Sequence, residues 1–426
     1  MPAMAQAQDG IAELKQQIKG LTERLERLET TKTPGALDQA LERRPAPPQT
    51  QTVYDEGFWF VGPDDKLKVG GAVQFDSRFY EPGNPGLDTF QVRRARLHAT
   101  GVLEGIWGYM VMGKWDRGTP ALHFGWLEYQ QYPFVRVRVG QFKEPYSLEG
   151  ANSDQYFDFN ERSLWVANLL QLEDLGVMVH GKLWGQRLEY GLGVFNGRGA
   201  NKDDTNDEKE TVGQLTLIPF RALDASWWKG LHVSLSGADS KLEDDLKDSF
   251  FKTAGQTAFW KFASTVTPKG HKTRTSAEIE WYVGPGSLRG GVHRAVLNAL
   301  QLGATEKDLP IDGWVVSGSY LLTGEKKPRN KPVMPATEFN PPKSGGALEV
   351  AARYEQFRGP RDLLTLGFFT GTPVVNSWTV GLNWHLNRHM RFLLDYQDAQ
   401  FDDPVVVHGE KIDGEKTLTF RTQFEI

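Results

Sequence analysis

The chain has 426 residues, no cysteine and a formal net charge of -5. This charge excludes the strongly basic field that is typical of nucleic-acid-binding proteins. No run of about 18 apolar residues occurs, which excludes a transmembrane helix. Glycine (45 residues), Trp (13), Phe (24) and Tyr (12) are plentiful. Such a composition fits a transmembrane β-barrel with aromatic girdles, and a large soluble β protein is the alternative at this stage.

The first nine residues contain Ala3, Met4 and Ala5, which match the small-x-small pattern of a signal-peptide cleavage site. No charged or apolar segment precedes them. Residues 1–9 are therefore interpreted as the remnant of a signal peptide or as an ordinary disordered start.

Residues 10–30 carry a helical pattern. Six aliphatic residues follow the alternating three-four spacing of a heptad seam: Ile11, Leu14, Ile18, Leu21, Leu25 and Leu28. An isolated helix of this length is marginal in water, so the seam predicts a coiled coil with a partner chain. The heptad pattern favours a coiled coil of two helices, whereas attachment to a trimeric body would impose three helices. A single amphipathic helix is the alternative.

Residues 31–60 are rich in proline and poor in apolar residues, which predicts a linker. From Lys66 onward the hydrophobic period changes to two; for example, Val137 lies between Arg136 and Arg138. Sixteen such segments can be counted within 61–426. An even number of antiparallel strands can close, and sixteen leave an aqueous channel.

Alternation by itself does not separate a membrane barrel from a soluble one, but three other features favour the membrane. The segments are about 10–14 residues long, more than the usual soluble strand. Links are either very short (Glu104-Gly105, 387–388) or long (241–270, 323–345), as in barrels with short periplasmic turns and long outer loops. Aromatic residues cluster near strand ends. The predicted fold is all-β: a 16-stranded antiparallel transmembrane β-barrel with a short N-terminal coiled coil.

Residues 143–174 lack strand periodicity although strands flank them. A loop of this length inside a compact domain is usually functional. In a closed barrel it either stands in solvent or folds into the lumen, and we expect it to fold inward and narrow the channel.

Basic residues gather on the predicted lumen face and at the start of this loop: Arg78, Arg94, Arg96, Arg136, Arg138 and Lys143. In a water-filled pore they would lower the barrier for anions. The loop carboxylates of Asp154, Asp158 and Glu161 are expected to face them and to cancel part of this preference. The alternative is internal ion pairing with the nearby acids: Asp76, Glu128, Glu144 or Glu161.

Catalytic and cofactor motifs are absent from the sequence. There is no Gly-x-Ser-x-Gly, no P-loop, no His-Glu-x-x-His and no cysteine for a thiol or zinc site. The sequence therefore predicts no enzyme, no cofactor and no metal site.

Six segments together resemble the phosphate-selective porin O and P family of Gram-negative outer membranes: Phe90–Leu97, Gly140–Glu149, Asn160–Leu164, Gly193–Gly197, Ser317–Glu325 and Thr379–Trp384. The resemblance implies a sixteen-stranded barrel, a homotrimer and an inward third loop. It also implies that Arg93 and Arg94 stand where family members place anion-contacting arginines. Alternation puts Arg94 in the lumen and Arg93 on the other face, unless a bulge lets both reach in.

One departure from the family pattern concerns specificity. Phosphate-selective members carry lysines in the inward loop, whereas residues 150–155 contain none. The sequence therefore predicts an outer-membrane porin for passive diffusion of small hydrophilic solutes and ions, with phosphate as one anion to test. The alternatives are a structural anchor that tethers the envelope through its periplasmic coiled coil, and a soluble carbohydrate-binding β protein. Expected partners are outer-membrane lipid or lipopolysaccharide and a cell-wall or periplasmic component.

Overall fold

The structure, a computed structural model, describes residues 15–24, 26–27, 50–55, 57–223, 227–242, 246 and 249–426. The chain divides into two compact units, Met1–Gln51 and Thr52–Ile426. In the first unit, residues 15–24 and 26–27 are helical, with Ile18 and Leu21 exposed. The other seam residues lie outside the described residues: Ile11, Leu14, Leu25 and Leu28. The segment 1–9 lies outside them as well. The coiled coil therefore stays a prediction. Within the described part, no helix has the length and apolar character needed to cross a membrane.

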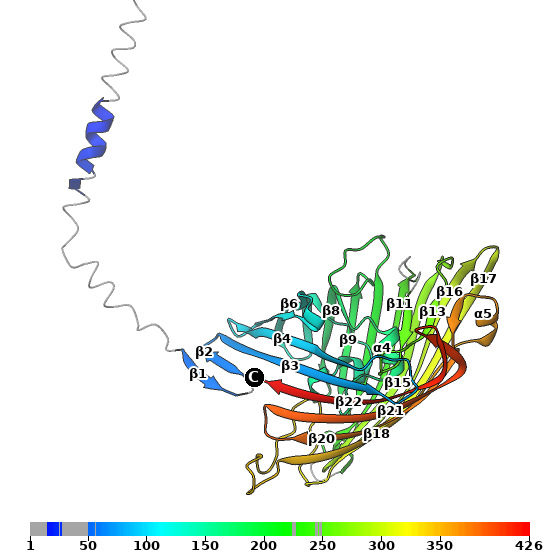
Figure 1. The fold of residues 1–426 in the computed structure, drawn as a ribbon. Helices are drawn as coiled ribbons and strands as arrows, with labels where there is room; N and C mark the ends of the chain where they lie inside the picture. The colour runs from blue at the N-terminus through cyan, green and yellow to red at the C-terminus, as the bar shows by residue number, and fades with distance from the viewer. Residues whose placement is uncertain are drawn as a thin grey trace, which may run out of the picture. The chain divides into compact units, whose positions relative to one another are not determined.

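The second unit is a closed antiparallel β-barrel (Figure 1). Its sixteen strands are β3 (Lys66–Tyr80), β4 (Thr89–Leu103), β5 (Trp107–Lys114), β6 (Ala121–Tyr132), β7 (Val135–Lys143), β8 (Glu173–Leu183), β9 (Leu188–Phe195), β10 (Glu210–Leu217), β11 (Leu231–Lys241), β15 (His271–Val283), β16 (Gly286–Leu302), β17 (Thr305–Leu321), β18 (Ala347–Arg358), β20 (Val374–His385), β21 (Met390–Val407) and β22 (Glu410–Glu425). β22 closes the barrel by pairing with β3, from Thr417 opposite Tyr80 to Glu425 opposite Ala72. The predicted sixteen-stranded antiparallel barrel is confirmed.

Three short strands extend this sheet: β1 (Gln51–Tyr54), β2 (Phe58–Val61) and β14 (Thr267–Pro268). β2 pairs with Lys66–Val69 of β3, beyond the stretch that β22 covers. β1 and most of β2 belong to the segment 31–60 that the sequence assigns to a linker, and residues 31–49 lie outside the described residues.

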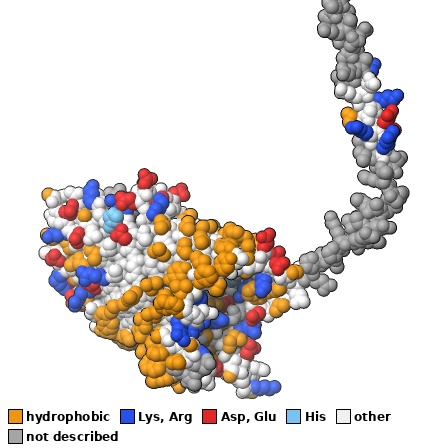
Figure 2. All heavy atoms as spheres, turned by 180° about the vertical axis from the view of Figure 1, so that it is seen from behind, with side chains coloured by type: hydrophobic (Ala, Val, Ile, Leu, Met, Phe, Trp, Pro, Cys, Tyr) orange, Lys and Arg blue, Asp and Glu red, His pale blue; other side chains and the backbone are white. Residues whose placement is uncertain are grey.

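The apolar side chains of the alternating strands point outward from the barrel. In β18, the side chains of Val350 and Tyr354 are exposed, whereas those of Glu349, Arg353 and Glu355 are buried inside the barrel. Figure 2 shows hydrophobic side chains over much of one outer side of the barrel. An apolar exterior with a polar interior is the arrangement that a lipid environment stabilises.

The links between strands alternate between two ends of the barrel. We call the end where β22 finishes the terminal end and the opposite one the loop end. The links 81–88, 115–120, 144–172 and 242–270 lie at the loop end, so 144–172 is the third loop there. The link 322–346 follows the twelfth strand and therefore lies at the terminal end. The prediction that this link is one of the long outer loops is wrong, because link length by itself does not report strand direction.

The loop 144–172 lies inside the barrel. It contains α3 (Leu148–Ala151), the 3-10 turn η2 (Asp154–Tyr156) and α4 (Leu164–Leu169). Carboxylates on the inner faces of three strands accept hydrogen bonds from its backbone amides. Leu148 N donates to Glu278 at 2.7 Å, Asn160 N to Asp395 at 2.6 Å and Leu164 N to Glu355 at 2.6 Å. Such bonds satisfy the irregular backbone that a buried loop would otherwise leave unpaired.

Two further inserts fill the lumen. At the loop end, β12 (Phe250–Lys252), β13 (Ala258–Phe262) and β19 (Phe369–Gly371) form a small sheet beside α5 (Arg361–Thr365). Their buried aromatic rings pack against Phe357 of β18. From the terminal end, the link 322–346 reaches in, and Ser153 N of the third loop donates to Asn330 Oδ1 at 2.7 Å. Segments from both ends of the barrel thus meet in its interior.

Candidate functional site in the barrel lumen

A β-bulge on β4 brings two neighbouring arginines to the same side. Gln74 of β3 pairs with Arg94, and the next residue, Phe75, pairs with Val92, so Arg93 has no partner on β3. A bulge of this kind can re-aim a side chain. Arg94 is buried and Arg93 reaches the third loop, while Val92 keeps an exposed outward position. Simple alternation assigns Arg93 to the outer face, and the bulge changes that assignment.

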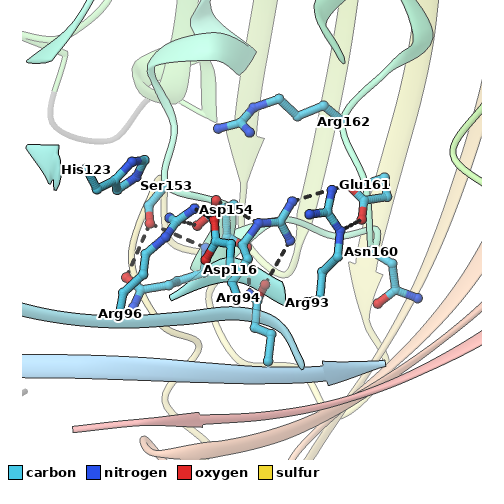
Figure 3. A network of polar contacts seen from close by, with 12 residues as sticks. Arg93, Arg94, Arg96, Asp116, His123, Ser153, Asp154, Asn160, Glu161 and Arg162 are labelled. Carbon is cyan, nitrogen blue, oxygen red and sulfur yellow. Dashed lines mark hydrogen bonds and ion pairs between the residues drawn. The ribbon is translucent and has the colours of Figure 1, made fainter. Parts of the chain in front are cut away.

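Arg93, Arg94 and Arg96 form, with the third loop, what we call the neutralised arginine cluster (Figure 3). Arg93 Nε and Nη2 donate to the two oxygens of Glu161 at 2.6 and 3.0 Å. Arg94 Nε lies 3.0 Å from Asp154 and its Nη2 lies 3.2 Å from Glu161. Arg96 Nη1 lies 2.7 Å from Asp154, and its Nη2 lies 3.6 Å from Asp116.

Charge in this cluster is balanced. Three guanidinium groups face the three carboxylates of Asp116, Asp154 and Glu161. Burial of the Asp154 carboxyl would raise its pKa, but Arg96 and then Arg94 hold that pKa well below its usual range. Burial likewise opposes ionisation of Glu161, and Arg93 and Arg94 hold its pKa far below the ordinary value. Both acids therefore stay ionised at physiological pH and fasten the loop to β4.

The remaining residues of the predicted set lie elsewhere. Asp158 meets Lys327 at 2.6 Å and Arg289 at 3.4 Å, so it does not face the β4 arginines. Arg78 is buried beside a small separate cavity. Lys143 Nζ donates to three backbone carbonyls at the end of α3: Gly150 at 3.1 Å, Ala151 at 3.3 Å and Asn152 at 2.5 Å. Lys143 thus binds the loop rather than standing free.

Arg136 and Arg138 belong to a second group on neighbouring strands, which we call the open cation cluster. It consists of these two arginines, His180 and the buried carboxylate of Glu128. Arg138 Nη2 lies 2.6 Å, His180 Nε2 2.7 Å and Arg136 Nη1 3.5 Å from that carboxylate. Arg136 is paired across the ladder with His180, and Arg138 with Glu128. One carboxylate therefore serves two permanent cations and a histidine that adds charge when protonated.

The open cation cluster faces a cavity of about 640 Å³. Seven lysines and arginines line this cavity: Lys68, Arg96, Arg136, Arg138, Lys143, Lys182 and Arg329. Four carboxylates line it as well: Glu144, Asp154, Glu189 and Glu425. Among the residues that line the cavity, lysines and arginines therefore outnumber carboxylates by three, and Glu128 is shared between Arg136 and Arg138. The side chains of Arg136 and Arg138 are 36% and 23% exposed, so part of this charge is open to water.

Three carboxylates meet at the foot of the third loop, and such a group could bind a metal ion. Glu144, Asp174 and Glu210 place oxygens within 4.8 Å of one another. Arg274 binds Glu144 at 3.0 Å and also binds Glu210, while Asp174 accepts a hydrogen bond from Gly197 N at 2.6 Å. An arginine thus already supplies positive charge to this set, which is explained as an ion-pair network.

Sequence reasoning missed several charged residues of the lumen. His180 alternates with Val177 and Val179 on β8, and the same period-two pattern that identified Arg136 could have found it. Lys327 and Arg329 carried no such signal, because they lie in an irregular link. In the structure Lys327 binds Asp158 and Glu349, and Arg329 Nε lies 2.8 Å from Glu280.

Comparison with known proteins places this barrel. The family model described as phosphate-selective porin O and P matches residues 67–426, whereas no curated protein matches the sequence. Similar solved structures include an anion-selective porin from Comamonas acidovorans, with 12% identity, 85% of this chain and 100% of that chain covered, and a TM-score of 0.53. OmpF of Salmonella typhi in complex with daunomycin has 12% identity, 88% and 100% coverage and a TM-score of 0.54.

The outer membrane channel DcaP of Acinetobacter baumannii has 8% identity, 85% and 97% coverage and a TM-score of 0.53. At such identities these likenesses concern the fold, whereas the family match covers nearly the whole barrel. Family and fold are those of a channel protein rather than an enzyme. The chain therefore belongs to the phosphate-selective porin O and P family and forms a channel of the Gram-negative outer membrane for passive diffusion of solutes.

Proposed function

We propose that this channel favours small anions and that the open cation cluster sets the preference. The observation that carries the proposal is the charge ratio at the cavity wall, where Arg136 and Arg138 share the single carboxylate of Glu128. An uncompensated cation in a water-filled pore lowers the free energy of an anion and raises that of a cation. Salt screens such charges over about 8 Å at physiological ionic strength, so ions that pass the cluster at closer range respond to it.

The neutralised arginine cluster has a different role in this proposal. Its guanidinium groups are occupied by Glu161 and Asp154, so they position the third loop and thereby limit the aperture. A passing anion would have to displace a carboxylate to bind them. Arg93, Arg94 and Arg96 are thus proposed as loop-positioning residues, and Arg136 and Arg138 as the residues that solutes contact.

Phosphate passes such a channel as one small anion among others. The loop segment 150–155 lacks lysine, and the carbonyls of its residues 150–152 accept hydrogen bonds from Lys143. These groups are acceptors, and a dedicated phosphate site needs donors. Selectivity for phosphate over chloride is therefore not part of the proposal, and neither is any chemical reaction.

The test is the zero-current potential of the purified protein in planar bilayers under a KCl gradient. Anion preference is expected for the wild type, and a clear shift toward cations for the double variant R136Q/R138Q. Arg294, which lies on the outer face and pairs with Asp312 at 3.3 Å, offers a matched control in R294Q. A double variant that shifts the potential no more than R294Q would contradict the assignment, and a cation-selective wild type would contradict the proposal itself.

We also propose a homotrimer in contact with outer-membrane lipid or lipopolysaccharide, with the N-terminal helix in the periplasm. The family resemblance and the exposed apolar exterior support this arrangement. The heptad spacing of residues 10–30 supports a second, structural role, in which the helix binds a cell-wall or periplasmic component. Light scattering in detergent would measure the assembly, and a monomer at micromolar concentration would contradict it.

A further inference from the structure

One part of the inner wall departs from the polar interior of a water-filled barrel. Met110 and Met112 on β5, and Phe124 and Trp126 on β6, line the cavity together with Met178 on β8. Their chain neighbours Val111 and Leu127 point outward and are exposed. The inner faces of porin-like barrels are ordinarily polar, so large apolar side chains at these positions require a reason.

The apolar side chains form a continuous strip. Met110 lies directly opposite Trp126 in the β5–β6 ladder, and Met112 lies opposite Phe124. On the next strand, Trp126 faces Gly140, whose φ of +122° is a conformation that side-chain-bearing residues rarely adopt. No side chain therefore covers the indole from that register position. We call these four residues, Met110, Met112, Phe124 and Trp126, the apolar strip.

Packing of the fold does not account for the whole strip. Met112 is buried, but Met110 and Phe124 are only half-buried and lie outside the hydrophobic core of the described residues. The aromatic core at the loop end is built from other residues. Methionine and aromatic side chains left partly exposed in a cavity offer an adaptable apolar contact, with favourable sulfur–ring geometry.

The strip adjoins the open cation cluster. The guanidinium of Arg138 lies 4.2 Å from the ring centre of Trp126, while Arg136, on the same inner face, has the most exposed side chain of the cluster. Cation and apolar surface therefore stand side by side on one wall. The cavity, at about 640 Å³, falls within the size of sites that enclose small organic molecules and is far larger than an inorganic oxyanion needs.

We infer that the channel binds small aromatic carboxylates at this wall, with the carboxylate at Arg136 and Arg138 and the ring on Met110 and Phe124. This inference rests on the proposed anion preference and names its solute class. An inorganic phosphate would gain from the arginines alone and would lose hydration beside the strip. An aromatic carboxylate satisfies both halves of the wall, because its charge and its apolar surface lie at opposite ends.

The experiment measures block of the chloride current in planar bilayers by benzoate, acetate and inorganic phosphate. Burial of one ring face supports a half-blocking concentration for benzoate that is about tenfold lower than for acetate. Equal block by benzoate and acetate in an anion-selective channel would overturn the inference and leave the proposed function standing. A channel without anion preference would instead contradict the proposed function.

Variants separate the two halves of the wall. M110Q and F124Q are expected to bring the half-blocking concentration of benzoate close to that of acetate while anion preference is retained. R136Q is expected to weaken block by both carboxylates. M334Q changes an exposed methionine of the link 322–346 and is the matched control, with benzoate block unchanged. Retained anion preference shows that M110Q, F124Q and M334Q are folded, and undiminished benzoate preference in M110Q and F124Q would refute the assigned wall.

Discussion

Two arginine groups in one lumen differ in what their carboxylates do. In the neutralised arginine cluster, the third loop supplies Asp154 and Glu161 at 2.6 to 3.2 Å from the arginines, and Asp116 at 3.6 Å completes the charge balance. In the open cation cluster, Glu128 comes from a barrel strand and serves two arginines at once. Position in the lumen is thus not enough to make an arginine available to a solute. Whether an arginine can bind a solute depends on the number of carboxylates within ion-pair distance, and a loop that folds inward supplies additional carboxylates.

Glu161→Gln should have the largest effect, because it removes a buried acid that Arg93 and Arg94 share in the neutralised arginine cluster. Arg93 and Arg94 would lose the carboxylate that both bind, and breaking a buried ion pair costs about 3–5 kcal/mol. We expect a lower unfolding temperature in detergent, a freed loop with larger single-channel conductance, and stronger anion preference. Thermal unfolding and bilayer recordings measure these changes. Unchanged conductance would show that Glu161 does not hold the loop.

Strong acidification should destabilise the wild type in the same way as this variant, because it protonates Glu161. The pH range of this loss follows from the pKa of Glu161. The pKa of Glu161 is lowered in the folded state from its ordinary 4.5, so its stabilising contribution is complete above pH 4.5. The contribution declines as the pH falls below that value and disappears below the folded pKa. The difference in unfolding temperature between the wild type and E161Q should therefore be constant from pH 7 to pH 5 and shrink under stronger acid. A difference that disappears at pH 6 would contradict the lowered pKa.

The sequence pattern predicts the barrel more completely than it predicts the candidate site. Alternation predicted sixteen strands because successive side chains of a barrel strand point in turn to the lipid and to the lumen. The bulge at Arg93 left no such mark, since one extra residue alters the pairing with β3 and not the composition. The contact of Asp158 with Lys327 joins segments 169 residues apart, and local pattern carries no information about it. The end at which 322–346 lies could have been derived, because an even number of strands precedes it.

Glu128→Gln should change selectivity in the direction opposite to loss of the arginines. Among the described residues, Glu128 is the acid that pairs with both Arg136 and Arg138. Its removal should therefore move the zero-current potential toward that of a more anion-selective pore. Glu189→Gln, which removes a cavity carboxylate paired with Lys182 at 2.8 Å, is the comparison, with a smaller shift expected. Equal shifts would mean that total lumen charge matters and the open cation cluster has no special place.

Lys143→Met tests the foot of the third loop with a moderate effect. The ammonium group binds three carbonyls, and loss of this buried donor costs about 1–3 kcal/mol. Unfolding temperature should fall less than in E161Q, and current fluctuations should increase as α3 loosens. Because carbonyls already surround this lysine, anion preference should change little. A selectivity loss as large as that of R136Q/R138Q would place Lys143 among the residues that solutes contact.

Deletion of residues 1–50 should have the smallest effect on transport. β2 and the barrel strands begin after this segment, and the closing pairs between β22 and β3 do not involve it. Single-channel conductance and zero-current potential should therefore equal those of the full chain. If the helix acts as a tether, the same deletion should release the porin from the cell-wall fraction of lysed cells while transport is unchanged. A changed conductance would instead place the N-terminal segment at the mouth of the pore, and the two arginine groups would then share the lumen field with charges from outside the barrel.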